Sequence, residues 1–265
     1  MRIIVPIKQV PETKAVKLDE TTGTVIRQGV ETIVNPLDLY AVEAALTLKS
    51  RCGGSITAVT MGPPQAAKAL KEVLSMGVDD AVLISDRAFA GSDTWATGTI
   101  LARAIRTLGH FDLILCGERA TDGDTGQVGP ELAAALGLPA ATYVSAIGRL
   151  ADNQAVVTRL LERGREELLL DLPALLTVVK EIGEPRLPTL NGKLRAKAAA
   201  IPVLNQQQLQ LPEEYIGLKG SPTRVVKIFR PPLTRRCTLL RAGDSKQLNR
   251  HVAALRQFLQ TRELI

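Results

Sequence analysis

Residues 111–130, FDLILCGERATDGDTGQVGP, decide the fold. The stretch begins with a short, largely apolar run, which predicts a buried strand. A polar loop with Gly123, Gly126 and Gly129 follows, and we expect a short helix after it that ends near Gly137. Glycine permits backbone conformations and close approaches that other residues forbid. A strand, a glycine-rich loop and a helix in this order form the repeating unit of a parallel sheet.

The same order of elements recurs before this stretch. We predict strands at residues 3–7, 55–60 and 81–85, and helices at residues 36–52, 64–76 and 93–108. Asn35 and Pro36 mark the first helix start, because asparagine accepts from free helix amides and proline fits the first helical turn. The alternation predicts an α/β protein with a three-layer parallel sheet. Such sheets bind ligands beyond the C-terminal ends of their strands.

The pattern changes after Tyr143. Residues 155–161, 167–172 and 174–179 read as strands without intervening helices, and the first two read as a hairpin. Residues 185–222 are rich in proline, glutamine and basic residues without a clean period, so we expect an extended surface segment. A strand near 223–229 and a helix at 244–260 complete the chain. We interpret residues 1–222 as one domain and residues 223–265 as a C-terminal arm.

The helix expected in the arm carries an apolar stripe. Its members are Leu248, Val252, Leu255 and Leu259. A helix with one apolar stripe packs that stripe against another surface. The sequence leaves open whether the stripe packs on another chain or on its own domain.

Two loops have the residue types of a site for an anionic ligand. In the loop at 117–130, Asp122 and Asp124 offer acceptors for ribose hydroxyls, Thr125 and Gln127 offer donors, and the helix start near Val128 offers amides to a phosphate. In the loop GSDTWATG at 91–98, the polar residues are Ser92, Asp93, Thr94 and Thr97. Ordinary turns and helix caps are the alternative reading of both loops. We expect Trp95 to pack beneath its helix.

Composition and motifs exclude several classes of protein. The net charge is +6, yet aromatic residues make up only 3%, too few for the stacking surfaces of nucleic-acid-binding proteins. The basic segments fit either a docking surface for an acidic protein or a solvated face. No phosphate-binding GxxxxGK[ST] loop or GxSxG nucleophile motif occurs, and His110 and His251 have no metal-ligand spacing. We expect no metal site and no catalytic side chain.

The N-terminus has no signal-peptide layout and no apolar run is long enough to cross a bilayer. Three cysteines lie far apart without CxxC spacing, which is typical of reduced thiols. We therefore expect a cytoplasmic protein that does not insert into a membrane.

Several segments together resemble the beta subunit of electron-transferring flavoproteins. They are VPIKQVPE at 5–12, RQGVETIVNPLDLYAVEAAL at 27–46, VTMGPPQA at 59–66, DGDTGQVGP at 122–130, and a signature-like stretch at 159–177 that Arg163 interrupts. The resemblance implies an adenine-nucleotide α-hydrolase-like fold. One branch of this family holds AMP as a structural ligand. The other holds a second FAD and splits the electrons of NADH between two acceptors.

The chain resembles the second, electron-bifurcating branch, which includes nitrogen-fixation-associated and anaerobic acyl-CoA systems, because both GSDTWATG and DGDTGQVGP are present. The family often has alanine where Gly126 stands. The resemblance implies an adenosine end lined by Pro6, Asn35, Asp38 and Met61. It implies ribose and pyrophosphate contacts from Asp122, Gly123, Asp124, Thr125, Gly126, Gln127, Val128 and Gly129. Flavin-side contacts would come from Ser92, Asp93, Thr94 and Thr97.

The resemblance also implies partners. PRLPTLNGKLRAK, residues 185–197, stands where the family has a recognition loop for dehydrogenases. Leu190 stands at its anchoring leucine, with a basic rim that includes Arg195 and Lys197. The C-terminal helix would cross onto an alpha subunit. The implied route runs from NADH through FAD to the alpha-subunit flavin and an acyl-CoA dehydrogenase or quinone oxidoreductase, and separately to ferredoxin or flavodoxin.

Three alternatives remain at the sequence level. The nearest is a non-bifurcating subunit with AMP. The second is a stand-alone adenine-nucleotide-binding regulatory module, which the long extension after Val179 disfavours. The third is a nucleotide-activating ligase or sulfurtransferase, whose SGGxDS-type loop has no counterpart at residues 8–11. Whether the chain oxidises NADH as an enzyme, and then only within a heterodimer, stays open.

Overall fold

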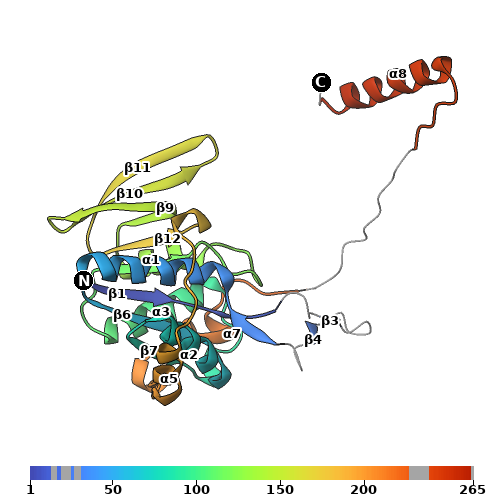
Figure 1. Ribbon diagram of the computed structural model, residues 1–265. Coiled ribbons are helices and arrows are strands. Elements are labelled where there is room, and N and C mark those ends of the chain that lie inside the picture. The colour runs from blue at the N-terminus through green and yellow to red at the C-terminus, as the bar shows by residue number, and fades with distance from the viewer. Residues whose placement is uncertain (13–16, 19–24, 27–30, 227–238, 264–265) are drawn as a thin grey trace. The chain divides into compact units, whose positions relative to one another are not determined.

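The computed structural model describes residues 1–12, 17–18, 25–26, 31–226 and 239–263. The chain divides into two units, Met1–Val226 and Lys227–Ile265. The first unit contains the sheet and its covering helices (Figure 1). In the second unit the described residues form one helix, α8 (Ser245–Thr261).

A nine-stranded sheet organises the first unit, in the order β11–β10–β9–β12–β8–β1–β6–β7–β13. The strands are β1 (Arg2–Pro6), β6 (Ser55–Met61), β7 (Asp80–Ile84), β8 (Leu113–Gly117), β9 (Ala140–Ala151), β10 (Gln154–Leu161), β11 (Gly164–Asp171), β12 (Ala174–Val178) and β13 (Val203–Leu204). All neighbours from β9 to β13 in this order pair in parallel, whereas β10 is antiparallel to β9 and β11. The mostly parallel sheet expected from the sequence is confirmed.

Small antiparallel pairs stand apart from this sheet. They are β2 (Gln9–Pro11) with β5 (Thr32–Val34) and β3 (Lys17–Leu18) with β4 (Val25–Ile26).

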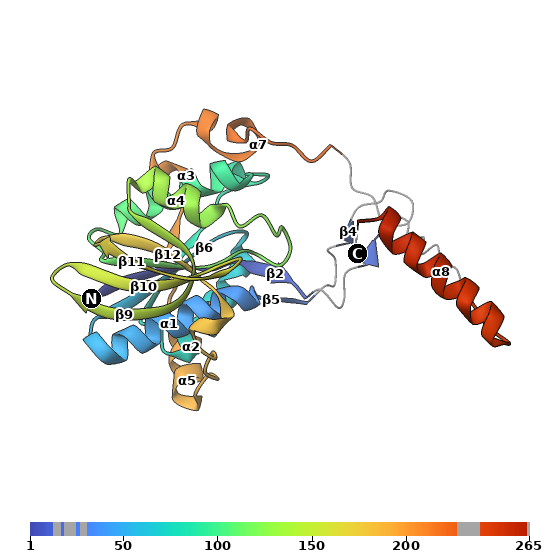
Figure 2. The same cartoon turned by 90° about the horizontal axis from the view of Figure 1, so that it is seen from above.

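Helices cover both faces of the sheet, as Figure 2 shows. One face carries α1 (Pro36–Cys52), α2 (Ala67–Met76) and α5 (Leu190–Ala198), and the other carries α3 (Thr94–Thr107), α4 (Val128–Leu136), α6 (Gln206–Leu209) and α7 (Gly217–Gly220). Short 3₁₀ turns are η2 (Pro64–Ala66), η3 (Arg87–Phe89), η4 (Lys180–Ile182) and η5 (Glu213–Tyr215). The three-layer arrangement predicted from the alternating pattern is confirmed.

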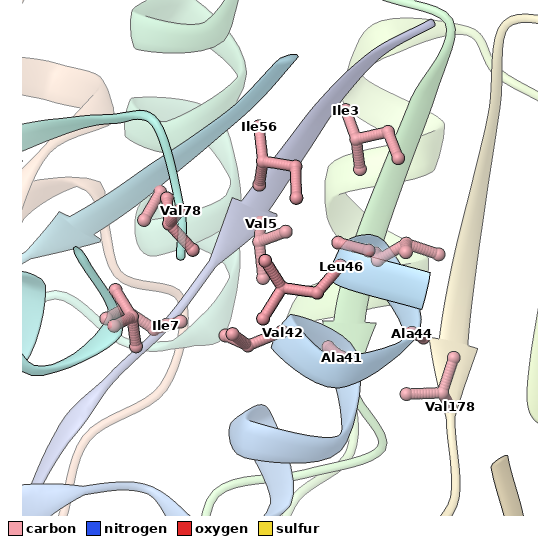
Figure 3. Packing of buried hydrophobic residues seen from close by; sticks show 14 of the residues in the cluster. Ile3, Val5, Ile7, Ala41, Val42, Ala44, Leu46, Ile56, Val78 and Val178 are labelled. Atoms are coloured by element: carbon pink, nitrogen blue, oxygen red, sulfur yellow. The ribbon is translucent and has the colours of Figure 1, made fainter. Parts of the chain in front are cut away.

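Each face of the sheet has its own core, because successive side chains of a strand point to opposite faces. Ile3 and Val5 of β1 join the cluster under α1, whereas Ile4 between them joins the cluster under α3 and α4. Figure 3 shows Val5 of β1 close to Val42 and Leu46 of α1. Full burial of such aliphatic side chains contributes about 1.5–3 kcal/mol each.

The chain order creates a switch point between β1 and β8. From β1 the chain adds β6 and β7 on one side, and it then returns to place β8 on the other side of β1. The connection after β1 contains α1 on one face, and the connection after β8 contains α4 on the other. Connections that leave on opposite faces open a crevice at the C-terminal ends of the two strands.

Two sequence expectations were wrong or incomplete in this unit. β9 is a twelve-residue strand that the pattern did not reveal, because Tyr143 has a φ of +57° and the pairing with β10 is interrupted by register shifts. Residues 185–222 are not simply extended, since they contain α5, β13, α6 and α7. Only Ala196 of α5 is buried, so this helix shows no apolar stripe in the sequence.

The other differences are local. Residues 223–226 form no strand, and the rest of the strand expected at 223–229 lies outside the described residues. Trp95 does not pack beneath its helix, because 52% of it is exposed. The helix predicted at 244–260 is confirmed as α8, which the Asp244 side chain caps by accepting from the Gln247 amide. Leu248, Val252 and Leu255 of α8 are exposed.

Among the described residues, no helix combines the length and apolarity needed to cross a membrane.

Candidate functional site

A cavity of about 340 Å³ lies at the switch point. Pro6, Ile7 and Lys8 line it from the end of β1, and Cys116 and Gly117 line it from the end of β8. The remaining lining residues are Asp38, Met61, Ser92, Asp93, Thr94, Thr97, Leu101, Glu118, Arg119, Ala120, Gly123, Thr125, Gly126, Gln127, Val128 and Gly129. The volume falls in the range of small-molecule sites, which is about 300–1,000 Å³.

The first turn of α4 offers unused donors to this cavity. The N-cap residue of α4 is Gln127, and its side chain makes no capping hydrogen bond. Pro130 in the first turn has no backbone N–H to donate. Within the described residues the amides of Val128 and Gly129 form no hydrogen bond, and both residues line the cavity. A helix N-terminus carries a partial positive charge and free amides, so this wall favours an anion.

The first turn of α3 also faces the cavity, through Thr94 and Thr97. Asp93 caps this helix, and its Oδ1 accepts from the Ala96 amide at 3.0 Å. The Thr94 hydroxyl donates to Oε1 of Glu131 in α4 at 3.2 Å, which joins the two helix starts. Burial and the nearby Asp93 charge raise the pKa of Glu131, although the Thr94 hydrogen bond lowers it.

Asn35 anchors the glycine-rich loop rather than capping α1. Its side chain makes no cap bond to the α1 amides, which corrects the sequence expectation. Instead Nδ2 donates to the Arg119 carbonyl at 2.9 Å, and Oδ1 accepts from the Thr121 amide at 3.2 Å. Asn35 is completely buried and lies outside the cavity wall. Its role in the structure is to hold the loop after β8 against the start of α1.

Two ion pairs hold the tip of the same loop. Lys8 Nζ lies 2.7 Å from Oδ1 of Asp122, and Arg119 Nε lies 2.9 Å from Oδ1 of Asp124. Asp124 has a φ of +54°, a left-handed conformation that aspartate tolerates better than most residues. Neither aspartate lines the cavity.

Asp38 is a buried carboxyl group in the cavity wall. Its Oδ2 accepts from the Lys8 amide at 2.7 Å, and only 6% of the residue is exposed. Burial raises the pKa of Asp38 from 3.8 to about 7, although hydrogen bonds from Lys8 and Asn35 and the Lys8 charge lower it. The group therefore titrates near neutral pH at the junction of β1, α1 and β8.

Most of the sequence-predicted cofactor residues converge on the cavity. Those that line it are Pro6, Asp38, Met61, Ser92, Asp93, Thr94, Thr97, Gly123, Thr125, Gly126, Gln127, Val128 and Gly129. Asn35, Asp122 and Asp124 do not line it. Sequence reasoning missed Leu101 of α3 and the residues at two strand ends. The latter are Ile7 and Lys8 after β1, Cys116 and Gly117 at the end of β8, and residues 118–120 after it. Lys8 stands inside the motif VPIKQVPE, so its position after a strand was the available signal.

The described residues contain no group of three or more His, Cys, Asp or Glu side chains able to hold a metal ion. Cys116 is buried in the cavity wall, where burial and the Asp38 charge raise the pKa of its thiol. A raised thiol pKa disfavours the nucleophilic thiolate. The chemistry that this site supports is binding and positioning of an anionic ligand.

The predicted recognition segment contains three exposed leucines. Leu187, Leu190 and Leu194 are 85%, 76% and 61% exposed. Part of the expected basic rim is used internally. Arg186 donates to both carboxylate oxygens of Glu43 in α1, at 2.9 and 2.8 Å.

Arg195 is similarly engaged. Its Nη2 donates to the Leu74 and Val78 carbonyls at 2.9 and 2.6 Å, at the C-terminal end of α2. Lys197 is exposed. As partner-binding residues, Leu190, Arg195 and Lys197 stay predictions.

A doubly wound α/β sheet with a cavity of small-molecule size at its switch point defines the chain as an α/β protein with a candidate ligand site at the position where such sheets bind ligands. Residues 22–209 match the electron transfer flavoprotein domain family, and the chain belongs to that family. It is a beta-type subunit, because its relatives include the electron transfer flavoprotein subunit beta of Thermoanaerobacterium thermosaccharolyticum. The two are 42% identical over 248 residues, which cover 93% of this chain and 94% of the relative.

Two further relatives carry names of larger systems. The chain is 47% identical over 233 residues to the caffeyl-CoA reductase-Etf complex subunit CarD of Acetobacterium woodii, with 88% of both proteins covered. It is 44% identical over 262 residues to protein FixA of Azotobacter vinelandii, with 96% of this chain and 93% of the relative covered. The resemblance described from the sequence is thus confirmed at the level of the family and the subunit type.

Proposed function

We propose that this chain is the beta subunit of a heterodimeric, electron-bifurcating electron transfer flavoprotein and binds FAD in the cavity at the switch point. One observation carries the proposal: a single cavity wall unites the first turn of α3 with the loop at residues 123–129. The start of α3 would contact the flavin side of a dinucleotide, and the loop at residues 123–129 would contact its pyrophosphate. A dinucleotide fits both segments, because its flavin part and its pyrophosphate are separate groups.

The residues present fit such a ligand. The unused amides of Val128 and Gly129 suit a phosphate, and Gly126 has a φ of +64°, which lets the loop turn its backbone toward the cavity. Thr125 and Gln127 add side-chain donors, and Asp38 at the other end adds an acceptor for a ribose or adenine group. When bound, a flavin supplies one- and two-electron redox chemistry. The chain binds it, orients it and shields it from water.

We further propose that the heterodimer takes electrons from NADH and passes them along two routes. One route leads to the alpha subunit and then to an acyl-CoA dehydrogenase or a quinone oxidoreductase, and the other leads to ferredoxin or flavodoxin. CarD, which is similar to this chain, is by its name a subunit of a complex with a CoA-ester reductase. This similarity supports an acyl-CoA-linked acceptor.

Cofactor content of the co-expressed pair tests the proposal. We expect two FAD and no AMP per heterodimer after denaturation and separation of the released nucleotides. One FAD and one AMP per heterodimer would contradict the bifurcating function and support a simple electron shuttle. The absence of any adenine compound from this chain would refute nucleotide binding altogether.

A pair of substitutions in one loop locates the site. Thr125→Leu adds bulk to a residue that lines the cavity, so it should lower the content of the second nucleotide. Thr121→Leu changes an exposed threonine of the same loop that does not line the cavity. This variant should still contain two FAD per heterodimer. Equal contents in the two variants would place the nucleotide elsewhere.

Leu190→Ala tests the dehydrogenase-docking surface. Loss of this exposed side chain from α5 should weaken coupling to the dehydrogenase about 10-fold or more, as truncation of an interface anchor does. Flavin content should not change, because Leu190 does not line the cavity. Leu161→Ala, at an exposed leucine of β10, is the control for general surface change. Steady-state electron transfer to the dehydrogenase measures the effect, and unchanged coupling would show the assignment of the loop to be wrong.

A further inference from the structure

The segment Gly217–Thr223, which we call the arm root, lies against the loop that opens α3. It ends shortly before the boundary between the two units at Val226 and Lys227. Figure 2 shows α7, the helical part of the arm root, next to α3, and the two helices are in contact. The arm root and the loop both belong to the first unit.

Ser92 and Asp93 make the polar contacts to the arm root. The Gly217 amide donates to Ser92 Oγ at 3.0 Å, and the Asp93 amide donates to Ser221 Oγ at 2.9 Å. The amide and the hydroxyl of Thr223 both donate to Asp93 Oδ2, at 2.9 and 2.8 Å. Hydrogen bonds to an ionised carboxylate are roughly twice as strong as neutral ones.

Two glycines and one buried side chain make this contact close. Gly217 has a φ of +58°, and a Cβ there would lie 2.4 Å from the Ala88 carbonyl oxygen. Gly91 has a φ of +77°, and a Cβ there would lie 2.7 Å from the Leu218 side chain. Ile216, which is 2% exposed, anchors the start of the segment in the core beside α3 and α4. The arm root therefore fits this loop by shape as well as by hydrogen bonding.

These contacts occupy the side chains of Ser92 and Asp93. Ser92 Oγ donates to the Phe89 carbonyl at 2.8 Å and accepts from Gly217, while Asp93 caps α3 with one oxygen and binds Thr223 with the other. The same two residues line the cavity, and Thr94 and Thr97 follow in the same helical turn. One short loop thus forms a wall of the cavity and also binds the arm root.

We propose that Ser92 and Asp93 are positioning residues that link ligand binding in the cavity to the attachment of the arm root. The inference rests on the proposed function, because it takes the ligand to be an adenine nucleotide. A ligand that contacts the α3 start orders the loop at 91–94, and the ordered loop holds its acceptors where Gly217 and Thr223 donate to them. Such coupling is reciprocal, so loss of the arm-root contacts weakens ligand binding by the same factor.

Amide hydrogen exchange of the full-length chain tests the link directly. Exchange at Gly217 and Thr223, whose N–H groups donate to Ser92 and Asp93, should slow about 5- to 10-fold when saturating FAD or AMP is added. Exchange in the remote hairpin of β10 and β11 should not respond. Ligand-independent exchange at both arm-root amides would overturn the link.

Substitutions in the arm root test the reverse direction without altering the cavity wall. The double variant Ser221→Ala/Thr223→Val removes both hydroxyls that bind the loop, so it should raise the Kd for FAD and AMP about 5- to 10-fold. Thr223→Ser keeps its hydroxyl and should bind as the wild type does. Lys219→Met is the matched control, since Lys219 lies in the arm root but pairs with Glu213 of η5 and makes no hydrogen bond to Ser92 or Asp93.

The outcomes separate this inference from the function on which it rests. If the wild type binds neither FAD nor AMP, the proposed function fails and the link fails with it. If the wild type binds a nucleotide and the double variant binds it equally well, only the link fails. A loss of affinity in the double variant that Thr223→Ser lacks, together with ligand-dependent protection of Gly217 and Thr223, supports it.

Discussion

Asp38 shows how a single buried group makes stability depend on pH. Burial raises its pKa from 3.8 to about 7 in the folded chain. Between these two values the folded state binds the proton more tightly than the unfolded state. The contribution of Asp38 to the free energy of unfolding is therefore complete below about pH 4 and is lost as the pH rises through about 7.

We predict that Asp38→Asn removes this dependence. The free energy of unfolding of the wild type minus that of the variant should be more positive at pH 5 than at pH 8, by about 2–3 kcal/mol. Urea unfolding of the ligand-free chains at both pH values measures it. Parallel pH profiles for the two proteins would show that Asp38 is not the titrating group.

Gly117 is a position where the tertiary structure leaves no room for a side chain. A Cβ at this residue would lie 2.5 Å from Oδ1 of Asp38 and 2.8 Å from the Leu37 backbone. Gly117→Ala should therefore destabilise the chain by about 1–3 kcal/mol, as overpacking does. Gly123→Ala, where no atom lies within 4 Å, should change stability by less than about 0.5 kcal/mol. Denaturant midpoints at fixed pH compare them, and equal stabilities would contradict the packing argument.

Residue types pointed in advance to the two loops that line the cavity, but they did not reveal which contacts the side chains make. Asp93 was expected among the flavin contacts, and it does line the cavity. Its carboxylate nevertheless binds Ala96 and Thr223, the latter 130 residues away in sequence. Asn35 likewise has the residue type of a helix cap and instead binds Arg119 and Thr121. Partners so distant in sequence leave no local pattern.

At the scale of elements, the pair of Glu43 and Arg186 joins α1 to the segment before α5. Burial raises the pKa of Glu43, but the hydrogen bonds and charge of Arg186 lower it further, so the net pKa lies below 4.5. The pair contributes stability above the pKa of the unfolded chain, and the contribution is lost as the pH falls through the lower folded value. The pair also fixes the chain that leads to Leu190.

Arg186→Met should destabilise the chain by about 1–3 kcal/mol at pH 7, because the buried Glu43 carboxylate loses its partner. The loss should shrink at acidic pH, where Glu43 becomes protonated in the variant. Urea unfolding at pH 7 and pH 4 measures both values. Arg149→Met, which breaks an exposed pair with Asp152, is the control and should have no measurable effect. An equal loss at both pH values would count against the ion pair.

Elements with strong local patterns were predictable, and those defined by tertiary contacts were not. β6 and α3 have apolar residues at regular spacing and appear within a residue or two of the expected bounds. β9 escaped notice because a left-handed residue, Tyr143, interrupts its alternation. In α5 only one residue is buried, so the helix depends on its contacts with α2 rather than on its own pattern.

At the scale of the whole molecule, both cores belong to the first unit. Among the residues that the structure describes, neither buried cluster contains a residue beyond Ile216. Within the described part of the second unit, no residue of α8 is buried, and Leu248, Val252 and Leu255 of its apolar stripe are exposed. An exposed apolar stripe of this kind fits a helix that packs on a partner chain.

A chain truncated after Val226 should therefore unfold at the same urea concentration as the full-length chain. It should fail to co-purify with the alpha subunit that we propose as its partner, because it lacks α8. Truncation after Leu211 removes Ile216 and the arm root, and it should lower the midpoint. Circular dichroism during urea unfolding provides the measurement. A lower midpoint for the first truncation would mean that the arm stabilises the sheet domain.

The amino-acid sequence by itself determined the class of fold, the two loops that line the cavity and the family. These properties depend on residues close together in the chain, whose spacing and type are visible directly. Only the tertiary structure decided where β8 returns beside β1, which side chains of the loops stay free for a ligand, and which bind Thr223 or Lys8 instead. Those choices come from contacts between residues far apart in sequence, and such contacts become specific only when the two cores pack.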